Sequence, residues 1–271
     1  MSQPTEFLSY FGFHTTPFTR EIRVQDLFVH EIYKDTLEHL LHTVNQRMSA
    51  TLIAPAGTGK TALLRALKSR LPDTRYRVHY VKVTNLSKRD FCREIAASVG
   101  ADAARIYPAL VRRIQERFAN TLDTDSLRPV LLVDEAHAMS PDLLGILRIL
   151  TTFDMDNRLV VSIILTGQPP LAKALRHQKL EDVAQRMAHQ ATLRLLSRKE
   201  TDAYIRHRCQ ITGVSACPFD QGAMEAIFEI GHGNLRATDH LAFKALEMAH
   251  HASCNTVDSN HVTTARGMLC L

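Results

Sequence analysis

The residues with the clearest chemistry form a short glycine-containing segment. Residues 54–61 read Ala-Pro-Ala-Gly-Thr-Gly-Lys-Thr, after an apolar run and before a helical pattern. Glycine lets successive backbone N–H groups converge on an anion, and the N-terminus of the following helix adds partial positive charge. This arrangement predicts a cradle for nucleoside triphosphate, in which Lys60 reaches the β- and γ-phosphates and the Thr61 hydroxyl completes a hydrated Mg²⁺ shell. The predicted cradle residues are Pro55, Ala56, Gly57, Thr58, Gly59, Lys60, Thr61 and Ala62.

One position of this loop departs from the usual pattern. Ala54 stands where the first glycine is expected. It ends the predicted strand, where a methyl group is tolerated if φ is negative, and Gly57 and Gly59, the glycines nearest the phosphates, are retained. An ordinary glycine-containing turn between a strand and a helix is the alternative, and the flanking periodicity disfavours it.

A second candidate site follows another apolar run. Val130–Val133 come after Pro129 and are typical of a buried parallel strand, and Asp134 and Glu135 come directly after them. The aspartate can hold Mg²⁺ through water, while the glutamate can orient and polarise the attacking water. An acidic pair after a strand is often only a solvated turn, but its place downstream of a phosphate loop favours nucleotide hydrolysis.

Composition limits the classes of protein to which the chain can belong. Its 271 residues suffice for one sizeable core and a small added domain, and no run of about 18 apolar residues predicts a membrane helix. The N-terminus lacks a basic-then-apolar signal sequence, so we expect a cytoplasmic location and no membrane partner. The formal charge of +5 and the pI of about 9.0 permit a polyanionic partner without requiring one.

The cysteines predict neither a disulfide framework nor a zinc site. Five scattered cysteines indicate reduced thiols. His250, His251 and Cys254 match no zinc spacing, and we expect them at the surface near the end of a helix.

The order of the predicted elements indicates an α/β fold. Strands are predicted at 49–54, 76–83, 129–134, 158–166 and 191–195. Helices are predicted at 31–47, 60–70, 87–99, 105–120, 141–151, 198–212, 220–230, 234–251 and 258–268. The alternation predicts a three-layer α/β/α core with a parallel sheet, followed by an all-helical lid whose helices can be capped by Ser197, Asp220 and Asp258. The expected domains are an N-terminal lead-in and helix packing on the core at 1–48, the nucleotide-binding core at 49–196 and the lid at 197–271.

A sheet core followed by a helical lid resembles the layout of AAA+ P-loop ATPases. Thr166-Gly167-Gln168 stands where that family places its sensor 1 residue, and Gly233-Asn234-Leu235-Arg236 where its sensor 2 arginine lies. Gln185-Arg186-Met187 is similar to a Gln-Arg-Ile stretch near the last strand. Together with Tyr10-Phe11-Gly12-Phe13 and Pro17-Phe18, these motifs make residues 7–265 resemble the ExeA-type group, which is related to the TnsC, TniB and MuB target-selection ATPases of bacterial transposons.

This resemblance implies cofactors and further site residues. It implies ATP and Mg²⁺, a bacterial cytoplasmic location, Gln168 touching the γ-phosphate or the attacking water, and Arg236 approaching the γ-phosphate from the lid. Phe18, Phe28 and Val29 are expected to line the adenine pocket or to serve a plain core role.

It also implies that the site is completed by a second subunit. Arg186 is the candidate arginine supplied to the neighbour's nucleotide, where a trans arginine stabilises transition-state charge. Relatives carry a second arginine four residues later, but this chain has Gln190, so Arg194 and Arg198 stay open as substitutes. A borrowed arginine predicts a homo-oligomer that assembles with ATP, as a closed ring or as a helical filament.

Three functions are compatible with such an ATPase. The first, which we expect, is a regulator of transposition that assembles on duplex DNA with ATP, marks the target, and recruits or activates a transposase, with hydrolysis driving disassembly and a target-selector protein as a further partner. The second is a secretion-type ExeA-like ATPase; such proteins carry a membrane span and a wall-binding domain after the ATPase, whereas this chain stops after the lid. The third is an ATP-gated protein-interaction switch without DNA binding.

The first function requires residues that contact the DNA backbone. In related assemblies, loops after the second strand line a channel for DNA, and the matching candidates here are Lys82, Thr84, Lys88, Arg89 and Arg93. Positioned cations and neutral donors bind phosphates without reading base sequence, so target choice would depend on partner proteins. A solvated helix start is the alternative for these residues.

Overall fold

The chain divides into two compact units, which we describe separately. The structure is a computed structural model that describes residues 3–102, 104–214 and 216–269. A sheet unit contains residues 31–55 and 60–193, and a helical unit contains the residues up to His30, residues 56–59 and the residues from Arg194 onward. The domain boundaries expected after residues 48 and 196 remain a prediction, because this division into compact units does not test them.

The sheet unit is built on five parallel strands in the order β2-β3-β4-β1-β5. Their bounds are β1 Ser49–Ile53, β2 Tyr76–Lys82, β3 Arg128–Asp134, β4 Ser162–Gly167 and β5 Met187–Thr192. The three inner strands are buried along almost their whole length, as expected of apolar strands covered on both faces. Because all strands run in one direction, the segments that follow β1, β3 and β4 meet at the same edge of the sheet.

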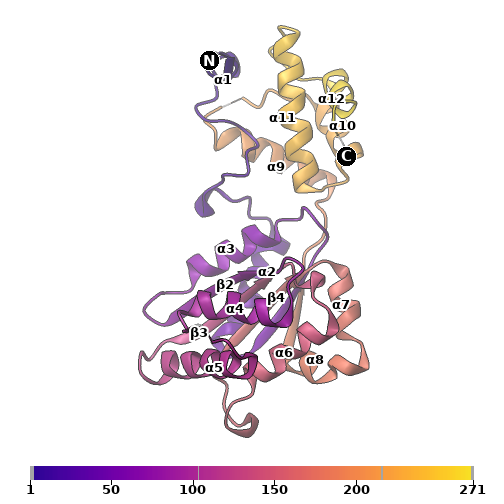
Figure 1. The fold of residues 1–271 in the computed structure, drawn as a ribbon. Helices are drawn as coiled ribbons and strands as arrows, with labels where there is room; N and C mark the ends of the chain where they lie inside the picture. Colours follow the sequence, from indigo (N-terminus) through magenta and orange to yellow (C-terminus); the bar gives the residue numbers. More distant parts are fainter. Residues whose placement is uncertain (1–2, 103, 215, 270–271) are drawn as a thin grey trace. The chain divides into compact units, whose positions relative to one another are not determined.

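Helices cover both faces of this sheet (Figure 1). Their bounds are α2 Glu31–Asn45, α3 Lys60–Arg70, α4 Lys88–Val99, α5 Tyr107–Asp123, α6 Pro141–Thr151, α7 Pro169–Leu175 and α8 Glu181–Arg186. Alternate strand residues, including Leu131, Val133, Ile163 and Leu165, share one hydrophobic cluster with α4, α5 and α6. Helices α2 and α3 contact each other, and α2 contacts β1 and β5. The predicted three-layer α/β/α core is therefore confirmed.

Some predicted elements are wrong in position or were missed. The last strand is Met187–Thr192 and not 191–195, because it lies at the edge of the sheet with Ala188, His189 and Gln190 exposed, so that no apolar run marks it. Strand β4 begins at Ser162, later than the predicted 158. Helices α7 and α8 are too short, at 7 and 6 residues, to show a clear period.

The helical unit consists of a cluster of short and medium helices. They are α1 Gln3–Phe11, α9 Arg198–Gln210, α10 Gln221–Gly231, α11 Leu235–His251 and α12 Ser259–Arg266. The predicted caps are confirmed, since the side chains of Ser197, Asp220 and Asp258 accept N–H groups from the first turns of α9, α10 and α12. Phe13 and Phe18, from the N-terminal segment, are buried in the apolar cluster of these helices.

Candidate nucleotide-binding site

The phosphate loop has the backbone conformation that its glycines predict. Gly57 and Gly59 adopt φ values of 74° and 91°, in the left-handed region that favours glycine. Ala54 does not have a positive φ. Its N–H donates to Gly167 O at 3.0 Å, so that Ala54 continues the pairing of β1 with β4. The replacement of the first glycine by alanine therefore causes no strain.

The lysine of the loop is buried and directed at the loop backbone. Lys60 is 6% exposed, and its Nζ donates to Ala54 O at 3.1 Å and to Pro55 O at 2.8 Å. A buried ammonium group beside left-handed glycines fits a bound polyphosphate, because the same donors can turn to phosphate oxygens. These features of the loop fit ATP as the ligand.

The acidic end of β3 is held by donors from four places in the sheet unit. Asp134 is 1% exposed, and its oxygens accept from the hydroxyls of Thr61 at 2.8 Å, Thr166 at 2.6 Å and Tyr80 at 3.1 Å, and from the Glu135 N–H at 2.9 Å. A buried carboxylate requires such partners. The predicted pair for Mg²⁺, Thr61 and Asp134, is thus brought together, and its hydroxyl and carboxylate oxygens suit that ion.

Tyr80 and Thr166 are site residues that the sequence analysis missed. Tyr80 lies on β2 and Thr166 on β4, the two strands beside β3, so that their positions follow from strand register and not from a local motif. Burial, and next the charge of Asp134, raise the pKa of Tyr80 above its ordinary value, so its hydroxyl stays a donor at neutral pH. The signal in the sequence that could have identified them is a polar residue near the end of each strand that neighbours β3.

Glu135 and Gln168 both lie close to a third residue, His137. The Nε2 atoms of Gln168 and His137 are 2.8 Å apart, and His137 Nδ1 is 3.5 Å from a carboxylate oxygen of Glu135. The donor and acceptor of the Gln168–His137 contact depend on the tautomer of the ring, and Nδ1, on the side of Glu135, is buried and makes no hydrogen bond to the described residues. Glu135 itself has a left-handed φ of 59°, and strand β3 ends at the residue before it. Sequence reasoning missed His137, although it lies two residues after the predicted base.

Arg186 does not join these residues. It comes directly before β5, and β5 runs parallel to β1 with Met187 beside Ser49 and Thr192 beside Ile53. Arg186 therefore lies at the amino edge of the sheet, whereas the phosphate loop follows the carboxyl end of β1. A strand of 6 residues separates these edges by about 20 Å.

The other candidate arginines lie in the helical unit. The Arg236 N–H donates to Gly57 O at 3.3 Å and the Asn234 side chain to Ala56 O at 2.8 Å, all within that unit, while the Arg236 side chain is exposed. The substitutes Arg194 and Arg198 pair with Glu200 and Glu225. Of the expected adenine-pocket residues, Phe18 is buried against Phe219, Phe28 packs against Tyr204, and Val29 is exposed.

The candidate DNA-contacting residues form a group at the end of β2 and the start of α4. Lys82 lies beside Asp134 in the sheet, and Thr84 is exposed in the following loop. Three others have partners within the chain, all exposed: Lys88 with Asp142 at 3.6 Å, Arg93 with Asp90 at 3.2 Å, and Arg89 with the Arg105 carbonyl. Such exposed pairs contribute little and can be exchanged for phosphate.

Three further features concern the described part of the chain. No group of three His, Cys, Asp or Glu side chains there can hold a metal ion, and the ring of His250 packs instead against Phe7 and Tyr10. Among the same residues, no helix is long and apolar enough to cross a membrane. The cysteines that the structure describes, Cys92, Cys209, Cys217 and Cys254, are free thiols.

A phosphate loop after β1 and an acidic end to β3, on a sheet of this order, define the fold of a P-loop nucleoside triphosphatase. Residues 34–175 match the family model described as AAA domain, more than half of the chain. The chain therefore belongs to this family of AAA+ ATPases, for which ATP is the implied ligand.

Relatives and solved structures agree with this assignment. The chain is 29% identical over 245 residues to general secretion pathway protein A of Aeromonas hydrophila, a match that covers 89% of this chain and 44% of that protein. The fold is similar to CDC6P of Pyrobaculum aerophilum, with a TM-score of 0.73 and 16% identity over 93% of this chain and 70% of the other. It is also similar to ORC1 of Aeropyrum pernix, solved in complex with DNA, with a TM-score of 0.67 and 17% identity over 92% and 68%. The chain thus spans less than half of its curated relative.

Proposed function

We propose that the protein hydrolyses ATP with Mg²⁺ in an assembly in which Arg186 of one subunit completes the nucleotide site of the next. The position of Arg186 carries the proposal. An arginine at the amino edge of the sheet cannot reach a nucleotide bound at the carboxyl edge of its own subunit, about 20 Å away. It can reach one held by a neighbour, and such an arginine stabilises the charge of phosphoryl transfer.

The residues at the carboxyl edge have separate roles in this proposal. The loop N–H groups and Lys60 bind the phosphates, and Thr61 and Asp134 hold the cation, which neutralises the charge that develops on the phosphate oxygens. Glu135 accepts a proton from the attacking water, and Gln168 orients that water or the γ-phosphate. His137 keeps the side chains of Glu135 and Gln168 in place relative to each other.

The test compares wild type with Glu135→Gln and Lys60→Ala. ATPase activity per subunit should rise with protein concentration, and sedimentation should show larger species with ATP than with ADP. E135Q should bind ATP and stay assembled, with turnover reduced about 100-fold or more, because it lacks the general base. K60A should fail to bind ATP, which makes it the control. A monomer that hydrolyses ATP at the same rate at all concentrations would refute the proposal.

For the partner of this ATPase, the comparisons favour a secretion-type, ExeA-like function over the transposition function expected from the sequence. The curated relative is named for general secretion, and it matches over 89% of the chain. In this function, assembly with ATP gates a contact with another protein. The end of the chain after the lid, taken above as evidence against secretion, has no weight, because the match covers only 44% of the relative.

A second candidate function keeps the DNA-binding proposal. It is supported by the net charge of +5 and by the exposed cations Lys88, Arg89 and Arg93, whose intrachain partners are exchangeable. In that case the assembly forms on duplex DNA and a transposase and a target-selector protein are its partners.

A further inference from the structure

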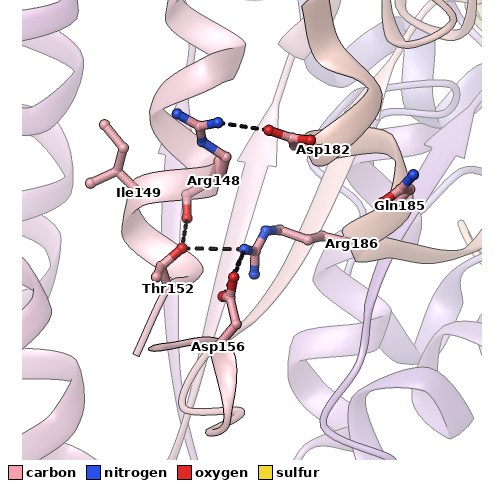
Figure 2. A pocket seen from close by; sticks show the side chains of 7 residues that line it. All are labelled: Arg148, Ile149, Thr152, Asp156, Asp182, Gln185 and Arg186. Atoms are coloured by element: carbon pink, nitrogen blue, oxygen red, sulfur yellow. Dashed lines mark hydrogen bonds and ion pairs between the residues drawn. The ribbon is translucent and has the colours of Figure 1, made fainter. Parts of the chain in front are cut away.

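A pocket of about 710 Å³ opens beside Arg186 (Figure 2). Its lining comes from the end of α6, the short helix η3 Asp154–Asp156 and α8. Two arginines point into it, and each is held by a carboxylate from a different element. Arg148 pairs with Asp182 at 2.6 Å, and Arg186 pairs with Asp156. The pocket therefore contains two comparable ion pairs, of which one includes the proposed trans arginine.

Arg186 is held through a single nitrogen. Its Nη2 donates to Oδ1 of Asp156 at 2.7 Å, to Oδ2 at 2.8 Å and to the Thr152 hydroxyl at 3.2 Å. The Arg186 side chain is 25% exposed and that of Asp156 is 53% exposed. The hydrogen bond from Arg186 lowers the pKa of Asp156 below its usual value, so the pair is fully charged at neutral pH.

Asp156 belongs to a turn with unfavourable backbone geometry. Asp154, Met155 and Asp156 have φ values of 48°, 54° and 68°, a run of left-handed residues without a glycine. Such a run persists only where the surroundings hold it. Here the holding contacts are ionic, since Arg158 pairs with Asp123 and Asp154, and Asp156 pairs with Arg186. Met155, at the apex, is 99% exposed. Loss of the contact to Arg186 would let this turn relax.

We propose that Asp156 is the stand-by partner of Arg186, holding the guanidinium while the subunit is alone and giving it up to the γ-phosphate of a neighbour's ATP on assembly. The inference rests on the proposed function of Arg186 and adds a competing carboxylate to it. An exposed ion pair is weak, whereas a phosphate carries more charge and binds arginine in a bidentate manner. Assembly must therefore break one ion pair for each completed site.

The test is a double-mutant cycle with a matched control from the same pocket. Asp156→Asn removes the competing charge and keeps the size of the side chain, and Asp182→Asn does the same to Arg148. D156N should lower the protein concentration for half-maximal ATPase activity about two- to fivefold, the range of an exposed ion pair. D182N should match wild type. In the Arg186→Ala background, which should lack ATPase activity, ATP-dependent assembly is followed by sedimentation instead, and D156N should leave it unchanged, because the two residues act as a pair.

The outcomes separate this inference from the proposed function. If R186A keeps wild-type activity, the role of Arg186 as a trans arginine is refuted. The proposed exchange of Asp156 for the γ-phosphate is then refuted as well. If R186A is inactive and D156N requires as much protein as wild type or more, Asp156 only supports Arg186, and the inference alone fails. Asp156→Gly, which suits the left-handed φ of 68° and also removes the carboxylate, should act like D156N and guards against a folding defect in one variant.

Discussion

At the scale of single residues, the buried carboxylate of Asp134 determines how the site is arranged. It gathers hydroxyls from Thr61, Tyr80 and Thr166, which come from the phosphate-loop helix and from both strands beside β3. Each hydroxyl satisfies a lone pair that would otherwise be buried without a partner. A cation binding at Asp134 and Thr61 would therefore enter a position in which the carboxylate is already fixed.

His137 provides the residue-scale prediction. His137→Ala should lower kcat about tenfold while KM for ATP changes less than about twofold, because the ring positions Glu135 and Gln168 and does not bind the phosphates. In the Glu135→Gln background, H137A should cause no further loss, since it acts through that residue. The measurement is steady-state ATPase at saturating protein, with His189→Ala, an exposed histidine on β5, as control. An unchanged kcat would show that the contact has no role in turnover.

The sequence predicted those site residues whose roles depend on neighbours in the chain. The phosphate loop and the pair after β3 are local patterns, so they could be recognised without a structure. Tyr80 and Thr166 contribute because β2 and β4 lie beside β3 in a particular register, which no local pattern specifies. His137 is near Glu135 in sequence, but only the fold brings Gln168 to its other side.

At the scale of elements, the start of α9 shows how one side chain can serve two purposes. Glu200 completes a capping box with Ser197, and it also accepts two hydrogen bonds from Arg194 at 2.6 and 2.9 Å. Both contacts require the ionised carboxylate. The pKa of Glu200 is lowered to about 2, chiefly by the hydrogen bonds from Arg194 and next, among the favourable contacts, by those from Ser197.

This pKa predicts how acid affects the helical unit. Because the pKa of Glu200 in the folded chain, about 2, lies below the ordinary value of 4.5, its stabilisation is complete above pH 4.5 and is lost as the pH falls toward 2. Glu200→Gln should therefore be less stable than wild type at pH 6 and approach it as the pH falls through that window. Urea unfolding followed by circular dichroism measures both. Glu225→Gln, at the exposed pair with Arg198, is the control, and an E200Q deficit constant with pH would contradict the assignment.

Strand β5, which the sequence analysis misplaced, and helix α8, which it missed, share a physical cause. Strand β5 exposes three successive residues at the sheet edge, and α8 has only 6 residues, so that neither shows the period of a half-buried element. Their positions are determined by pairing with β1 and packing against α6 and α7. This region contains Arg186, so the least predictable part of the fold positions the residue that carries the proposed function.

At the scale of the whole molecule, the net charge of the chain and its similarity to a secretion protein indicate different partners. The net charge of +5 suits a polyanion, whereas the curated relative is named for secretion. The solved structures are less than 25% identical and show the fold alone.

DNA binding measured over a salt series distinguishes these partners. A secretion-type ATPase should bind labelled duplex DNA equally weakly with ATP, ADP or no nucleotide. A transposition regulator should bind only with ATP, with an affinity that falls about tenfold or more between 50 and 200 mM salt as counterions are released. Fluorescence anisotropy with E135Q, which keeps ATP bound, measures this, and Lys88→Ala with Arg89→Ala tests the residues involved. ATP-dependent, salt-sensitive binding that these substitutions abolish would contradict the secretion-type function.

The separation of Arg186 from the acidic end of β3, at opposite edges of one sheet, has a genetic consequence under the proposed function. Each subunit donates Arg186 from one edge of its sheet and binds its own nucleotide at the other. A change at Arg186 therefore impairs the neighbour's site, whereas a change at Lys60 or Glu135 impairs the subunit's own site. Alleles that change Lys60 or Glu135 and alleles that change Arg186 would then complement each other when co-expressed, although each alone is inactive. Two alleles of the same edge would not. An open chain of subunits would also always contain one end whose nucleotide has no donor, and only closure into a ring would remove that end.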